Sequence, residues 1–145
     1  MDVTYTPIGV VRSPYDSPDD VPTPRDEDVA SRVVLDEAYA EGLDGLDGFS
    51  HVVVLAHLDG IGEAHLRARP PHVDDVEVGV FASRSPARPN PIAQSVVRLA
   101  DVEGTTLHVH GLDLVDGTPV LDVKPYVGGV DGADVERGWL DELDG

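Results

Sequence analysis

The chain has 145 residues, a formal net charge of −18 and no cysteine. This length suits one hydrophobic core, so we expect residues 1–145 to form a single domain with no additional C-terminal domain. The lack of cysteine excludes disulfides, thiolate metal sites and a thiol nucleophile. No run of 18 apolar residues occurs, and the N-terminus has no basic region followed by an apolar segment, which favours a cytoplasmic protein without a membrane span.

The acidic composition indicates an unusual solvent environment. Aspartate dominates the 28 acidic residues, and Lys124 is the only lysine. Such a surface repels itself in dilute buffer, whereas molar salt shortens the Debye length to about 3 Å and screens the charges. We therefore expect a halophilic protein of a salt-rich cytoplasm rather than one whose acids dock a basic partner.

The first half of the chain predicts three strands and a proline-rich loop. Residues 3–12 are β-branched and end at a Ser-Pro pair, which is typical of a strand followed by a turn. Four prolines between positions 14 and 24 then require an extended loop. A short strand is predicted at 31–35, a helical turn or two at 37–43, and a central buried strand at 49–57.

The second half predicts further short strands and one helix. The strands are expected at 76–81, 95–99, 107–112 and 120–123, separated by Gly, Pro and Asp turns. Residues 135–143 form an amphipathic helix in this interpretation, with Val135, Trp139, Leu140 and Leu143 on one face. Six or seven short strands with little helix favour a mainly β sandwich or barrel.

The segment SRSPARPNPIAQS, which starts at position 83, lies in a stretch from Val78 to Ala100 that contains no acid. Its three prolines restrict their own backbone and that of the preceding residues, so the loop is stiff before any ligand arrives. Arg84, Arg88 and Asn90 would then be preorganised polar contacts. A structural loop whose arginines pair with surface acids remains the alternative.

The segment GLDLVDGTPVLDVKPY, which starts at position 111, centres on a predicted tight turn at Asp116 and Gly117. Such a turn can expose backbone N–H and C=O groups that read the edge of a ring such as adenine. A plain hairpin with solvated aspartates is the alternative interpretation.

Other chemistries have weaker support in the sequence. His108 and His110 would share one face of a strand, but no third ligand lies at a suitable spacing, so no metal site is expected. Neither a GxGxxG nor a Walker phosphate motif occurs, and there is no GxSxG nucleophile elbow.

Four blocks together resemble the TsaA/TrmO family: IGVVRSPY (8–15), FSH (49–51), GVFASRSPARPNPIAQS (79–95) and LDLVDGTPVLDVKPY (112–126). The resemblance implies a single-sheet, antiparallel or mixed β-barrel of about seven short strands with few short helices, and not a Rossmann fold. It also implies a homodimeric, S-adenosylmethionine-dependent methyltransferase. Its expected reaction is methylation of N6 of N6-threonylcarbamoyladenosine, next to the anticodon of tRNA.

The same resemblance implies a set of site residues. Contacts to S-adenosylmethionine are expected from two blocks and two further loops, namely Arg84, Arg88, Asn90, Leu99, Asp116, Gly117, Thr118, Pro119, Pro24, Arg25, Asp26, Asp59 and Gly60. We expect the Arg88 guanidinium to pair with the methionine carboxylate and the site to be poor in carboxylates of its own. Candidates for accepting or polarising the N6 proton are Asp113, Lys124 and Tyr126.

Two alternatives keep the cofactor but change the function. One is methylation of a small metabolite, and the other is a noncatalytic module that binds S-adenosylmethionine. The acidic surface bears on the choice, because phosphate contacts normally supply much of the affinity for nucleic acids. If tRNA is the partner, a small arginine patch and base stacking should recognise it.

Overall fold

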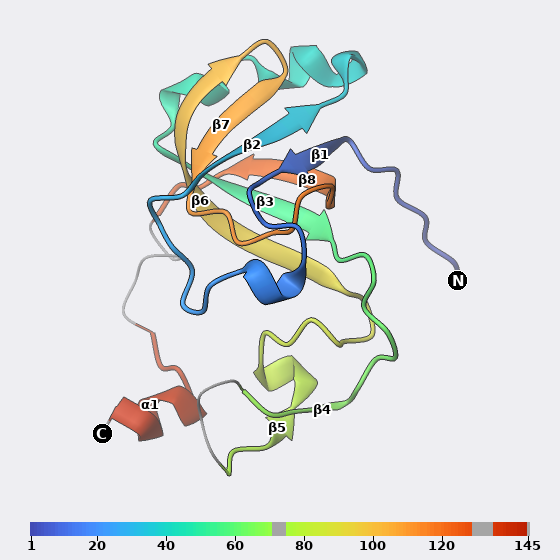
Figure 1. Ribbon diagram of the computed structural model, residues 1–145, viewed down its shortest axis with the longest axis vertical. Coiled ribbons are helices and arrows are strands. Elements are labelled where there is room, and N and C mark those ends of the chain that lie inside the picture. The colour runs from blue at the N-terminus through green and yellow to red at the C-terminus, as the bar shows by residue number, and fades with distance from the viewer. Residues whose placement is uncertain (71–74, 129–134, 145) are drawn as a thin grey trace.

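The computed structural model describes residues 1–70, 75–128 and 135–144. Its centre is a closed barrel whose strand order is β1-β2-β7-β6-β3-β8 (Figure 1). Each neighbouring pair in the barrel is antiparallel. The barrel strands are β1 (Gly9–Arg12), β2 (Ala30–Leu35), β3 (His51–His57), β6 (Ile92–Glu103), β7 (Thr106–His110) and β8 (Pro119–Pro125). The predicted mainly β barrel is thereby confirmed, with six strands in the barrel sheet.

Smaller elements complete the described part of the chain. β4 (Arg67–Ala68) and β5 (Val78–Gly79) form a separate two-stranded ladder, which lies with α1 (Trp139–Asp144) apart from the barrel (Figure 1). The 3-10 helices are η1 (Pro18–Asp20), η2 (Glu37–Leu43), η3 (Leu46–Gly48) and η4 (Val80–Ala82). In the described ranges, no helix is both long and apolar enough to cross a membrane.

Buried and more exposed residues alternate along the strands, and the buried ones form the barrel core. In β3 every second residue is fully buried, namely Val52, Val54 and Ala56, and the same alternation buries Leu107 and Val109 of β7. These side chains join one hydrophobic cluster in the interior of the barrel. Because side chains on a strand alternate between the two faces, the intervening residues point outward and are free to carry polar groups.

The barrel closes where β1 pairs with both β2 and β8. Gly9 lies opposite Leu35 on one side and Val120 on the other. A Cβ atom at Gly9 would overlap the backbone of Val34 and Leu35, so this close approach requires glycine. The predicted strand at 3–12 is correct only from Gly9 onward, where pairing partners exist on both sides.

Two other predicted elements differ from the structure. The strand predicted at 76–81 is reduced to β5, because the Ser83 N–H and hydroxyl both donate to Val80 O and close a turn. The helix predicted from position 135 starts only at Trp139, after Gly138, whose φ of 57° is not helical. Leu140 and Leu143 on this helix are exposed, and the Trp139 indole N–H donates to Ala82 O at 2.7 Å.

β6 is longer than the predicted segment 95–99. It pairs with β3 from Ile92 to Arg98 and with β7 from Arg98 to Glu103. β6 therefore pairs with two neighbours along different halves of its length, and the proline-braced loop leads directly into its first residue, Ile92.

Candidate functional site

A cavity of about 1070 Å³ lies between the loop before β6 and the turn before β8. Eight of the predicted site residues line it: Arg25, Asp59, Arg84, Arg88, Asp113, Asp116, Gly117 and Thr118. Two segments separated by more than 20 residues thus share one cavity, which is large enough for a nucleoside-sized ligand.

Three arginines, Arg25, Arg84 and Arg88, form what we call the arginine wall of this cavity. Each is held by backbone carbonyl oxygens. Arg88 Nη1 donates to Ser83 O at 3.0 Å and to Ser85 O at 3.1 Å. Since both of these bonds use one nitrogen of Arg88 and a guanidinium has five N–H donors, further donors remain for a ligand.

The other two guanidinium groups are anchored in the same manner. Arg84 Nη2 donates to Gln94 O at 2.8 Å, and Arg25 Nη1 donates to Val96 O at 2.6 Å and Gly111 O at 3.2 Å. Within residues 1–70, 75–128 and 135–144, none of the three arginines forms an ion pair with a carboxylate. The positive charge of this wall is positioned but not neutralised.

Asp113 and the turn from Val115 to Thr118 also line the cavity, and we call this part of the lining the aspartate wall. Thr118 N–H and Thr118 Oγ1 both donate to Val115 O, at 3.2 and 2.6 Å, and close the turn. Gly117 has a φ of 88°, a conformation that glycine adopts without strain. The predicted tight turn at Asp116 and Gly117 is therefore present.

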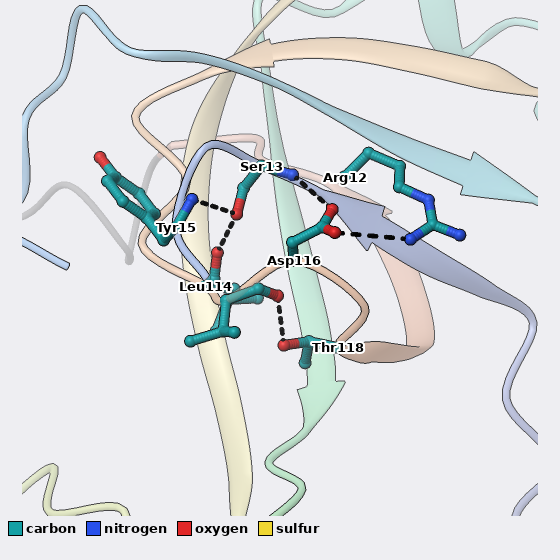
Figure 2. A network of polar contacts seen from close by, with 7 residues as sticks. Arg12, Ser13, Tyr15, Leu114, Asp116 and Thr118 are labelled. Atoms are coloured by element: carbon teal, nitrogen blue, oxygen red, sulfur yellow. Dashed lines mark hydrogen bonds and ion pairs between the residues drawn. The ribbon is translucent and has the colours of Figure 1, made fainter. Parts of the chain in front are cut away.

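Asp116 is fixed by the end of β1 (Figure 2). Its Oδ1 accepts from Ser13 N–H at 3.1 Å, and its Oδ2 lies 3.6 Å from Arg12 Nη1. Ser13 Oγ in turn donates to Leu114 O at 2.7 Å. Residues of the block at 8–15 thus position the turn in the block at 112–126.

The turn lacks the free N–H groups expected for reading a ring edge. Asp116 N–H donates to Tyr15 O at 2.7 Å and Gly117 N–H to Val11 O at 2.8 Å, while Thr118 N–H closes the turn. The backbone groups of Asp116 and Gly117 that have no bond within the described part of the chain are their carbonyl oxygens. This turn can accept hydrogen bonds from a ligand.

Asp113 is the one predicted catalytic residue that lines the cavity. Its Oδ1 accepts from the hydroxyl of buried Ser95 at 2.7 Å. Burial raises the pKa of the nearby Tyr15 phenol, and the charges of Asp26 and Asp113 raise that pKa further. Tyr15 therefore stays protonated at neutral pH and cannot act as the base.

The other two predicted catalytic residues lie outside the cavity lining. Lys124 pairs with Asp122 at 2.8 Å, and the hydrogen bond and charge of Asp122 raise the pKa of the lysine. The Tyr126 ring packs edge-on against His51, with ring centroids 6.4 Å apart.

Six of the predicted cofactor contacts are also absent from the lining: Pro24, Asp26, Gly60, Asn90, Leu99 and Pro119. Several have structural roles nearby. Asn90 O accepts from Ile92 N–H at 2.7 Å at the start of β6, and Leu99 packs partly against the barrel core. Asp26 Oδ1 accepts from Asp28 N–H at 3.0 Å.

The cavity is not poor in carboxylates, so that expectation is wrong. Asp59, Asp113 and Asp116 all line it, because the acid-free stretch supplies one side only. Sequence reasoning also gave no role to Ser95 and Tyr15, although both lie in the blocks that carry the resemblance. Their only signal was their position inside those blocks.

A second, smaller cavity of about 630 Å³ lies on the other side of Asp116. It is lined by the end of β1, the start of β2 and the end of β7, including Arg12, Arg32, His108 and His110. In the part of the chain that the structure describes, no group of three potential metal ligands is present.

The family model for the tRNA-methyltransferase O N-terminal domain matches residues 10–132. The chain belongs to this family. The match confirms the resemblance to TsaA/TrmO proteins that the four sequence blocks indicated.

Curated relatives that match this chain include an archaeal and a mammalian protein. A probable S-adenosyl-L-methionine-binding protein of Pyrococcus abyssi is 39% identical over 143 residues, which cover 97% of this chain and 77% of the relative. A tRNA (adenine(37)-N6)-methyltransferase of Mus musculus is 36% identical over 135 residues, or 86% of this chain and 31% of the mouse protein.

The fold agrees with a solved structure of the family. The crystal structure of TrmO from Pseudomonas aeruginosa is 36% identical and superposes with a TM-score of 0.80. The match covers 97% of this chain but only 64% of the Pseudomonas chain, so this chain spans less than two thirds of that protein.

Proposed function

We propose that this protein is an S-adenosylmethionine-dependent methyltransferase that acts on N6 of N6-threonylcarbamoyladenosine next to the anticodon of tRNA. The observation that carries the proposal is one cavity lined both by arginines that form no ion pair in the described residues and by aspartates held by hydrogen bonds. Membership of the tRNA-methyltransferase O family and the names of the mouse and Pyrococcus relatives support it.

The charge pattern of the cavity fits the cofactor. S-adenosylmethionine carries a carboxylate together with an ammonium and a sulfonium group, and when bound it supplies an electrophilic methyl group. The arginine wall suits the carboxylate, because guanidinium groups bind carboxylates with two parallel hydrogen bonds. The Asp116 carboxylate suits the hydrogen-bond donors and positive charge of the rest of the ligand.

In this proposal Arg88 binds the methionine carboxylate. Its guanidinium is held in place before binding by Ser83 O and Ser85 O, so little side-chain entropy is lost when the ligand arrives. Arg84 and Arg25 add positive charge to the same wall, and their hydrogen bonds go to backbone carbonyl oxygens rather than to an aspartate.

The turn from Val115 to Thr118 holds the nucleoside part. The carbonyl oxygens of Asp116 and Gly117 can accept hydrogen bonds from an exocyclic amino group of adenine, and the Asp116 carboxylate can accept from ribose. Asp116 has lone pairs beyond those used by Ser13 and Arg12, so this role is compatible with its structural contacts.

Asp113 accepts the proton from N6, or polarises the N–H bond, during transfer. Ser95 holds one of its oxygens in the cavity, and Lys124 and Tyr126 do not line that cavity. Displacement at a methyl carbon needs alignment more than acid–base strength, so positioning by the two walls should supply most of the acceleration.

The proposal includes a homodimer that works in a salt-rich cytoplasm. The formal charge of −18 supports the second part, since screening by salt relieves repulsion within and between subunits. Sedimentation equilibrium in dilute and in molar potassium chloride tests both parts. A dimer in molar salt is expected, and a monomer at every salt concentration would contradict the homodimer.

The activity is tested with tRNA that carries N6-threonylcarbamoyladenosine, isolated from a strain without the methyltransferase gene. After incubation with S-adenosylmethionine in molar salt, nucleoside mass spectrometry should find this nucleoside converted to its N6-methylated form. An unmodified transcript is the matched control. If both RNAs stay unmethylated while the protein binds the cofactor, the methyltransferase assignment is wrong.

Cofactor binding without methyl transfer is the second candidate. It is favoured by the location of Lys124 and Tyr126 outside the cavity, which leaves Asp113 as the one predicted proton acceptor in the lining. The Asp113→Asn variant separates the two candidates. A methyltransferase should lose turnover and keep cofactor affinity, whereas a binding module would show no turnover in either form.

A further inference from the structure

The outer face of the barrel carries a second cationic feature, apart from the arginine wall. In the register of the sheet Arg12 lies opposite Arg32, and Arg32 lies opposite His108. One step along the same strands, Arg98 lies opposite His110. Directly opposed residues share a face of the sheet, so these five side chains form a group across β1, β2, β7 and β6 that we call the barrel-face row.

Two arginines in this row have no partner in the described part of the chain. The other eight Lys and Arg side chains there each contact a carboxylate or a backbone carbonyl oxygen, whereas Arg32 and Arg98 are exposed and form neither an ion pair nor a hydrogen bond. In a chain with 28 acidic and 10 basic residues, two unpaired arginines on one face oppose the general charge pattern.

A polar atom within the row also lacks a partner. His110 Nδ1 is buried and has no hydrogen bond, and His110 lines the cavity of about 630 Å³ together with Arg12 and Arg32. Buried polar atoms are normally paired, so His110 Nδ1 is an unusual unpaired group within the row, although its burial keeps a ligand from contacting it directly.

Three acids lie near the row, and two of them pair with the row members Arg12 and His108. Asp116 is held by Ser13 N–H and lies 3.6 Å from Arg12, and Glu103 lies 3.5 Å from His108. Asp101, opposite His108, accepts from Val102 N–H. Asp116 lies at the β1 end of the row, and Asp101 and Glu103 lie on β6, the strand that also carries Arg98. Arg32, His110 and Arg98 have no acid directly opposite in the register.

We propose that the barrel-face row binds the phosphate backbone of the RNA substrate and guides it toward the larger cavity. Arg32 and Arg98 lie two strand spacings apart across the sheet and two residues apart along it, roughly 12 Å in all. This is too far for one small anion but suits phosphates at separate positions of one nucleic-acid strand. Arg12 joins the row to the cavity, because its partner Asp116 lines both cavities. The inference rests on the proposed function, in which RNA is the methyl acceptor.

The test compares two double variants that each remove two positive charges. Arg32→Gln with Arg98→Gln changes the row. Arg67→Gln with Arg69→Gln changes two exposed arginines that pair with Glu77 and lie outside both cavities, and is the matched control. Affinity for a tRNA transcript is measured by fluorescence anisotropy over a range of potassium chloride concentrations.

The row variant should bind the transcript about tenfold more weakly at the lowest salt. Its plot of log affinity against log salt should be shallower by about one for each arginine removed. The control should stay within about twofold of the unchanged protein. Equal losses in both variants, or no loss in the row variant, would overturn the proposal.

Two further measurements separate this inference from others. If sedimentation shows that the row variant dissociates a dimer that the unchanged protein forms, the face is a subunit interface and the proposal is wrong. Calorimetry with S-adenosylmethionine tests the larger cavity independently. RNA affinity that depends on the row, in a protein that does not bind the cofactor, would support the row and refute the proposed function.

Discussion

The two walls of the large cavity carry opposite charges, and different contacts hold the charged groups of each wall in place. On the arginine wall, the charge comes from side chains that bond to backbone carbonyl oxygens. Arg88 bonds to its own loop, and Arg84 bonds to Gln94 of β6. On the aspartate wall the backbone turns at Gly117, which has a positive φ. The carboxylate of Asp116 is held by Ser13 N–H and Arg12, which lie at the end of β1. The first wall should therefore govern ligand affinity, while the second should also govern the stability of the barrel.

Replacing Arg88 tests the first wall and should give the largest effect. Arg88→Ala is expected to weaken binding of S-adenosylmethionine by 10- to 100-fold, consistent with about 1.5–3 kcal/mol for a hydrogen bond to a charged group. Arg88→Lys should recover part of the loss, since it keeps the charge but not the paired donors. Isothermal titration calorimetry measures both.

Arg69→Ala is the control for that experiment, because Arg69 is exposed and pairs only with Glu77 in the described structure. Its affinity should match that of the unchanged protein. Identical affinities for Arg88→Ala and Arg69→Ala would remove Arg88 from the cofactor site.

Replacing Gly117 tests the second wall. No atom lies within 4 Å of a Cβ built at Gly117, so Gly117→Ala acts through its φ of 88° alone. It should lower the free energy of unfolding by about 1–2 kcal/mol. Gly42→Ala, at an equally open position without positive φ, should change stability little. Urea unfolding compares them, and equal stabilities would show that the turn is not constrained.

The pH dependence of stability offers a smaller test at Tyr15, whose carbonyl oxygen accepts from the Asp116 N–H of the aspartate wall. Because the folded protein raises the pKa of Tyr15, its neutral phenol contributes stability that is present below about pH 10. That contribution is lost as the pH rises through the folded-state pKa. Tyr15→Phe should therefore flatten the fall in unfolding free energy above pH 10, measured by urea titration. Parallel curves for the two proteins would contradict this.

The sequence predicted the elements whose signal is local. Five consecutive apolar residues from Val52 to Ala56 identified β3, and Asp116 with Gly117 identified the turn. The length of β6 was underestimated, because its extra residues are in a strand only through pairing with β3 and β7. Closure of the barrel by β1 and β8 likewise depends on partners over 100 residues apart.

The site likewise divides into features that local sequence predicted and features that depend on distant contacts. The motif blocks predicted which segments contribute, and Arg88 and Thr118 do line one cavity. They did not predict that the turn N–H groups bond to Tyr15 and Val11, or that Lys124 pairs with Asp122 away from the cavity. Motif position identifies a segment, whereas the direction of each side chain depends on contacts that only the folded chain reveals.

The central claim is that the arginine wall binds the cofactor carboxylate, and a ligand that lacks this group tests it most directly. Calorimetry should compare S-adenosylmethionine with its decarboxylated analogue on the unchanged protein and on Arg88→Ala. We predict a 10- to 100-fold preference for the carboxylated ligand in the unchanged protein, and loss of most of that preference in the variant. Equal affinity of the unchanged protein for both ligands would contradict the account.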